Sequence, residues 1–184
     1  MAEYIFLLNI VLISIFQIFM MISYILRKKK EKFWGSLILY AVVMAFLIYE
    51  HYSSMKIPEL ILTCFVITVL GHSFVGKYLE VYYTSEVYDR YLHLLGSFSF
   101  SLVAYAVIDY LLRPGTESVI YKSVFVMTIG VTLGAFFEIA EFVHDIYFPK
   151  KIRSQHGLED TDFDLIFNTV GAFIAGALSG VILK

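Results

Sequence analysis

Acidic and imidazole side chains recur at helical spacing in the second half of the sequence. Within each group the residues are three or four apart, so they share one face of a helix. Carboxylate oxygens combined with an imidazole nitrogen bind divalent cations, and a carboxylate that stays off the metal can take a proton from water. The pattern therefore predicts a metal site and metal-assisted chemistry. The groups are Asp89 with His93, Glu138 with Glu141, and Asp160 with Asp164 and Asn168.

A divalent metal is the expected cofactor, because several carboxylates in a poorly solvated site cannot all remain ionised without compensating charge. Magnesium, manganese and iron suit oxygen ligands with one imidazole, and zinc is a further candidate. Cys64 is the sole cysteine, which excludes the usual thiolate zinc site. Glu138 and Glu141 are also the candidate catalytic residues, one of them as general base. The expected metal ligands are His93, Glu138, Glu141, Asp160 and Asp164.

Basic and amide side chains near these acids predict a phosphate ligand. Arg90 and Arg153 can each grip phosphate through two hydrogen bonds, and Asn168 is expected to contact the same substrate. Thr161 and Asp162 precede an apolar segment and are expected to cap the last helix, whose N-terminus favours anions. A lipid phosphate or polyprenyl phosphate is the expected substrate.

Six apolar segments must position these residues. A helix needs about 20 apolar residues to cross a bilayer, and the segments lack the period-two alternation of barrel strands. With 59% hydrophobic and 16% charged residues and a mean hydropathy of +0.77, the chain is expected to be an all-α membrane bundle. A net charge of −2 argues against a nucleic-acid partner. The expected spans, within one domain covering 1–184, are 4–26, 34–52, 57–75, 91–112, 121–147 and 164–183.

The lysines and arginines predict the orientation. Ten of the fourteen follow the first, third and fifth spans, which the positive-inside rule assigns to the cytoplasmic side. Both termini are then outside the cytoplasm, and the acidic groups gather at the cytoplasmic ends of their helices. We expect a multi-pass protein of the bacterial cytoplasmic (inner) membrane. The ten residues are Arg27, Lys28, Lys29, Lys30, Lys32, Lys77, Arg90, Lys150, Lys151 and Arg153.

Three sequence blocks carry a family resemblance. Residues 88–93, 134–141 and 155–168, with Gly96 and Gly171, resemble the YjdF-like bacterial inner-membrane proteins. The last block is more loosely similar to the VanZ-like family, which also has an acidic helix end and a closing helix with Asp, Asn and Gly. The resemblance implies a multi-span membrane protein without a settled reaction, and the VanZ-like family is associated with glycopeptide resistance.

Three functions are consistent with these observations. The first is a metal-dependent enzyme acting on a lipid phosphate. The second is an ion- or proton-coupled transporter or binding protein, which at this size would need to form a homodimer and to continue polar groups toward the outer face. Asp109 is the one ionisable residue there that belongs to a motif-bearing span, which favours the enzyme. The third is a non-catalytic protein of envelope stress or glycopeptide resistance, whose acids form only salt bridges.

Overall fold

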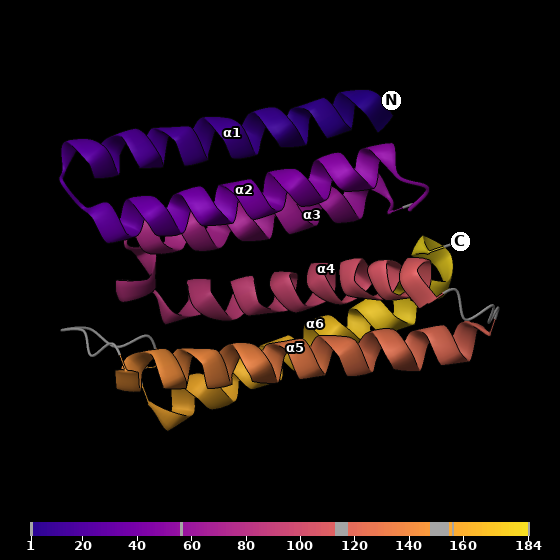
Figure 1. Cartoon of the computed structure of the whole chain (residues 1–184). Helices are drawn as coiled ribbons and strands as arrows, with labels where there is room; N and C mark the ends of the chain where they lie inside the picture. The colour runs from indigo at the N-terminus through magenta and orange to yellow at the C-terminus, as the bar shows by residue number, and fades with distance from the viewer. Residues whose placement is uncertain (1, 56, 113–117, 148–154, 156, 184) are drawn as a thin grey trace. The chain divides into compact units, whose positions relative to one another are not determined.

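The structure, a computed structural model, describes residues 2–55, 57–112, 118–147, 155 and 157–183. These residues contain helices and no strands (Figure 1). They include six helices long and apolar enough to cross a membrane, as the sequence predicts. The protein is thus an all-α, multi-pass membrane protein. It divides into two compact units, Met1–Val81 and Tyr82–Lys184, which are described separately.

The first unit consists of α1 (Ala2–Leu26), α2 (Lys30–Tyr52) and α3 (Glu59–Leu70), with α3 continuing into the π-helical segment η1 (Gly71–Tyr78). The continuation carries the third span three residues past its expected end at 75. Polar side chains join the helices inside this unit. Gln17 of α1 is fully buried, accepts a hydrogen bond from Ser36 Oγ at 2.7 Å and donates one to Ser73 Oγ at 3.0 Å. Such bonds hold helices together in lipid, where no water competes for them.

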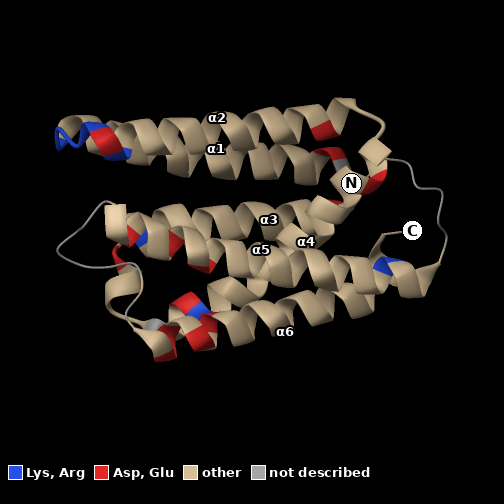
Figure 2. Cartoon of the chain, turned by 60° about the horizontal axis from the view of Figure 1, so that its bottom comes forward, with Lys and Arg blue, Asp and Glu red and all other residues tan. Residues whose placement is uncertain are grey.

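The second unit consists of α4 (Glu86–Leu112), α5 (Val119–Tyr147) and α6 (Leu158–Ile182), which all pack on one another. The short 3₁₀ turn η2 (Val81–Tyr83) precedes α4. Because α5 runs antiparallel to the other two helices, its end lies beside their beginnings. Figure 2 shows acidic residues gathered there, where α5 ends and α6 begins.

Glycines set the close approach of these three helices. A Cβ on Gly130 of α5 would lie 2.6 Å from the Ala172 Cβ of α6, and a Cβ on Gly171 of α6 would run into the carbonyl oxygen of Leu94 in α4. Real Cβ atoms do not approach so closely, so larger residues here would push the helices apart. The short distances between helices are what allow polar side chains on three of them to meet.

Two helices begin at least five residues earlier than expected. α4 starts at Glu86 instead of 91, and α6 starts at Leu158 instead of 164. The predicted capping of the last helix by Thr161 and Asp162 is therefore wrong. The N-cap is Gly157, with φ of +140° and no side-chain capping bond. Its positive φ suits glycine, which has no Cβ to clash.

Two expectations are untested by this arrangement. The location of both termini outside the cytoplasm stays a prediction, as does the single domain over 1–184. Three of the basic residues that predict the orientation lie outside the described residues, namely Lys150, Lys151 and Arg153.

Candidate metal centre

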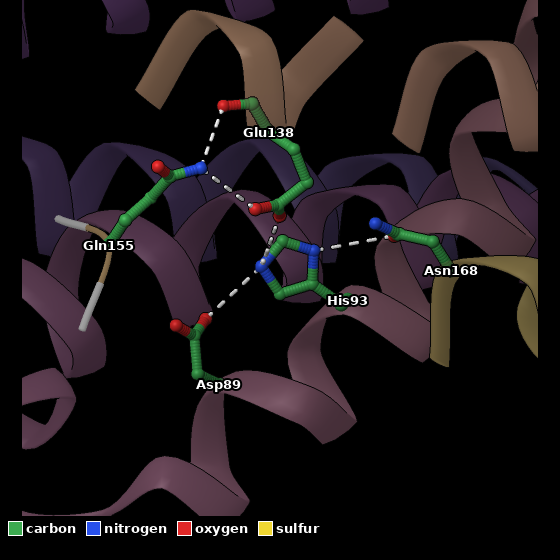
Figure 3. A network of polar contacts seen from close by, with 5 residues as sticks. All are labelled: Asp89, His93, Glu138, Gln155 and Asn168. Atoms are coloured by element: carbon green, nitrogen blue, oxygen red, sulfur yellow. Dashed lines mark hydrogen bonds and ion pairs between the residues drawn. The ribbon is translucent and has the colours of Figure 1, made fainter. Parts of the chain in front are cut away.

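His93 of α4 is the residue around which the polar groups of the second unit gather (Figure 3). Its Nε2 atom lies 3.4 Å from Asp89 Oδ1, one turn earlier on α4, and 3.7 Å from Glu138 Oε1 on α5. Its Nδ1 atom lies 3.3 Å from Asn168 Oδ1 on α6. The imidazole is buried and connects all three helices.

Asp164 of α6 completes a group able to hold a metal. One ligand atom each from Asp89, His93 and Asp164 lies within 4.8 Å of the other two. Two ligands on one dication are at most about 4.4 Å apart, twice a bond of roughly 2.2 Å, so small side-chain adjustments would bring all three onto one ion. We call Asp89, His93 and Asp164 the triad.

The Asp164 carboxylate is 2% exposed, and its Oδ1 atom has no hydrogen-bond partner among the described residues. Burying a polar atom without a partner is costly, and more so for a charged group. A cation bound by the triad would satisfy this oxygen. This unsatisfied atom distinguishes the triad from an ordinary acidic cluster.

Glu138 of α5 lies beside the triad and is 5% exposed. The loop residue Gln155 donates from Nε2 to the Glu138 carbonyl oxygen at 3.1 Å and to Glu138 Oε2 at 3.4 Å. The backbone N–H of Gln155 donates to Asp145 Oδ2 at 3.0 Å. The other Glu138 oxygen, Oε1, accepts no hydrogen bond among the described residues and lies on the side of His93. It is available as a further metal ligand or as a proton acceptor.

The five expected metal ligands do not all converge. His93, Glu138 and Asp164 come together, while Glu141 and Asp160 are half-buried and outside the triad. Asp160 is nevertheless close enough to act electrostatically on Glu138 and Asp164. It adds negative charge to the group and so strengthens the attraction for a cation.

One member of the triad, Asp89, was absent from the expected metal ligands, and one neighbour of the site, Tyr82, was absent from the expected site residues. Asp89 belongs to the triad, and its spacing of four from His93 is the sequence signal that points to it. Tyr82 lies before α4, outside the spans. Burial, together with the nearby carboxylates Asp89 and Glu141, raises the pKa of the Tyr82 phenol. The phenol therefore stays protonated and can donate a hydrogen bond toward the acids.

The structure describes two of the three residues that are expected to bind phosphate, Arg90 and Asn168. Arg90 Cζ lies 4.1 Å from the centroid of the Phe163 ring, a cation–π contact between α4 and α6. Arg90 follows Asp89 in α4, and Phe163 precedes Asp164 in α6. The contact between Arg90 and Phe163 therefore lies at the same two helix ends as the triad. Asn168 lies against His93. Arg153 is outside the described residues.

Comparison with known proteins places the chain in a family. The model of DUF2238, described as a predicted membrane protein family, matches residues 8–184. The chain belongs to DUF2238. It is also 31% identical over 166 residues to an uncharacterised protein of Thermotoga maritima, a match covering 90% of this chain and 85% of the relative. No solved structure matches it. Neither comparison supports the predicted likeness to VanZ-like proteins.

Proposed function

We propose that this protein is a divalent-metal-dependent enzyme of the bacterial cytoplasmic membrane. It hydrolyses the phosphate ester of a lipid phosphate or polyprenyl phosphate at the cytoplasmic leaflet. The observation that carries the proposal is the triad with its buried, unsatisfied Asp164 oxygen. The proposal also includes the resemblance to YjdF-like proteins, because the three sequence blocks that carry this resemblance contain Asp89, His93 and Asp164.

Charge supports a dication at this site. Asp89, Glu138 and Asp164 contribute three carboxylates, while His93 contributes at most one positive charge. Carboxylates this close cannot all stay ionised in a poorly solvated site. A divalent cation compensates two of the charges and leaves the carboxylates free to act as ligands or bases. The ligand set of two carboxylates and one imidazole leaves coordination positions for water and for a phosphate oxygen.

The chemical step needs one base, and Glu138 is the residue we assign to it. A bound metal would make its coordinated water a stronger acid and would polarise the phosphoryl group. Glu138 Oε1 takes a proton from the water as the water oxygen bonds to phosphorus. The ester P–O bond breaks with its electron pair on the leaving oxygen, which then takes the proton from Glu138. The products are inorganic phosphate and the lipid alcohol.

Arg90 is the residue we assign to binding the phosphate. Its Cζ atom lies over the Phe163 ring, 4.1 Å from the centroid, and its guanidinium is a planar fork of donors that suits the oxygens of a phosphate. A lipid substrate fits a site at the end of membrane-spanning helices, because the acyl or prenyl chain can stay in the bilayer while its headgroup reaches the metal.

One observation favours transport as a second candidate. Beyond His93, α4 carries three buried serines, Ser97, Ser99 and Ser101, which extend polar character away from the triad. Their hydroxyls donate to backbone carbonyl oxygens, as Ser97 Oγ does to Gly130 at 3.3 Å. A transporter would use the same cluster as a cation or proton site, and a homodimer would supply further helices. Uptake of Mn²⁺ or protons into proteoliposomes tests this candidate.

The enzyme proposal is tested by phosphate release. Purified protein in nanodiscs is incubated with Mn²⁺ or Mg²⁺ and either a polyprenyl phosphate or phosphatidic acid. The expected result is metal-dependent release of inorganic phosphate that falls about 10²–10⁴-fold in Glu138→Gln, the range for loss of a general base. The matched control is Glu159→Gln, the same change at an exposed residue of α6, which should leave release unchanged. Metal-loaded protein that releases phosphate from neither substrate would contradict the proposal.

A further inference from the structure

The direction in which His93 faces bears on which dication the site takes. Its Nε2 atom points to Asp89 and Glu138, so a metal bound here would have a nitrogen ligand as well as oxygen ligands. An imidazole nitrogen suits iron and zinc, and of the two ions that prefer oxygen ligands, manganese is softer than magnesium and accepts an imidazole more readily. Magnesium prefers oxygen ligands and usually keeps several of its waters. Asp164 and His93 are both buried, which disfavours an ion that must keep most of its waters.

Asn168 determines which nitrogen of His93 faces the carboxylates. Its Oδ1 atom lies 3.3 Å from His93 Nδ1, and an amide oxygen can only accept a hydrogen bond. With Oδ1 on this side of the ring, Nδ1 is the hydrogen-bond donor and carries the proton, and Nε2 is the nitrogen that faces Asp89 and Glu138. Histidine ligands of metals commonly donate their second N–H to an oxygen in this way, which fixes the ring and raises the basicity of the ligand nitrogen.

Asn168 is itself fixed by the helices around it. The side chain is 4% exposed and lies against Gly134 of α5, where a Cβ would come within 2.7 Å of Asn168 Cβ and Cγ. Three helices thus contribute to one arrangement: Gly134 of α5 makes room for Asn168 of α6, which orients His93 of α4. A residue so closely packed has little freedom to turn away from the imidazole.

We propose that the site selects a transition-metal dication, Mn²⁺ in the simplest case, over Mg²⁺, and that Asn168 is the positioning residue that enforces this selection through His93. The inference rests on the proposed metal site and adds the class of metal. It also assigns Asn168 a role different from the substrate contact expected from the sequence.

The experiment measures binding of Mn²⁺ by electron paramagnetic resonance of the purified protein, with Mg²⁺ as competitor. Wild-type protein is expected to bind one Mn²⁺ per chain and to release it only when Mg²⁺ is in at least about tenfold excess. Asn168→Leu should lower the Mn²⁺ affinity by about 10–100-fold, the usual effect of losing a partner of a metal-bound histidine. The Mg²⁺ affinity should fall by less, so the selectivity decreases.

Two comparisons separate positioning from folding. Asn168→Asp keeps an oxygen that can accept the Nδ1 proton of His93, so this variant should retain the selectivity for Mn²⁺. Thr169→Val, a change at the neighbouring residue of α6, should leave the selectivity unchanged. Asn168→Ala replaces the leucine variant if that protein does not fold. Wild-type protein that binds Mn²⁺ and Mg²⁺ equally overturns the selectivity, and unchanged selectivity in Asn168→Leu or Asn168→Ala overturns the role of Asn168. Wild-type protein that binds neither ion overturns the metal site itself.

Discussion

Asn168 of α6 lies against Gly134 of α5, so closely that a single methyl group at 134 would meet the Cβ, Cγ and Nδ2 atoms of the asparagine. Gly134→Ala should therefore displace Asn168 and loosen its contact with His93. We expect a loss of about 1–3 kcal/mol in the free energy of unfolding, typical of overpacking. Binding of Mn²⁺ should weaken as well. Thermal unfolding in detergent and Mn²⁺ titration measure the two effects.

The matched control is Gly35→Ala in α2, where a Cβ would meet no atom within 4 Å. Alanine favours a helix over glycine by about 0.5–1 kcal/mol, so this variant should be as stable as the wild type or slightly more stable. If Gly134→Ala were to behave like Gly35→Ala in both stability and Mn²⁺ affinity, Asn168 would not be held as described.

The sequence and the structure differ on whether Asp89 or Glu141 is a metal ligand. The sequence selects Glu141 as a ligand, while the structure has Asp89 in the triad and Glu141 outside it. Asp89→Asn should therefore lower the Mn²⁺ affinity more than Glu141→Gln, because only the first change removes a charged oxygen from the triad. Isothermal titration of both variants tests the ranking. Equal losses, or a larger loss for Glu141→Gln, would favour the ligand set expected from the sequence.

The membrane fold was predictable because it depends on the length of the apolar segments and on their lack of charged residues. Runs of about 20 apolar residues must form helices in lipid, where every backbone hydrogen bond has to be made internally. The starts of α4 and α6 were less accessible. Both helices begin with segments rich in charged residues, 86–90 and 158–163, which a hydropathy pattern assigns to loops although they are helical.

The sequence predicted at which end of the helices the site lies, but it predicted only some of the residues that form the site. Spacing shows that Asp89, His93, Asp164 and Asn168 lie on helical stripes. It does not show how each helix is rotated about its axis. That rotation depends on packing, such as Gly171 against the Leu94 carbonyl and Gly134 against Asn168. The contacts of Gln155 were equally hidden, because they depend on the path of a loop that hydropathy does not describe.

Gln155 offers a test of how Glu138 is held. Gln155→Ala removes the donor to Glu138 Oε2, so the carboxylate should be less well oriented toward the water that it is proposed to deprotonate. We expect phosphate release to fall by about tenfold, which is less than the loss of about 10²–10⁴-fold expected when the base is removed altogether. The Mn²⁺ affinity should stay unchanged, because Gln155 touches no member of the triad among the described contacts.

Gln155→Glu provides the comparison, since it puts a second carboxylate beside Glu138 and should lower release further than alanine does. Steady-state assays of release, run beside Mn²⁺ titrations, distinguish the two effects. A parallel loss of metal affinity and of release in Gln155→Ala would mean that Gln155 supports the fold of the whole site and has no specific action on Glu138.

The central claim is that Asp89, His93 and Asp164 bind a divalent metal, and metal stoichiometry tests it most directly. Protein purified and saturated with Mn²⁺, then freed of loosely bound ion, is analysed by elemental mass spectrometry. The wild type and the exposed control Asp162→Asn should each retain one Mn²⁺ per chain, while Asp164→Asn, which removes the buried charge two residues away, should retain none. Absence of metal from the wild type, or equal retention in Asp164→Asn, would contradict the account.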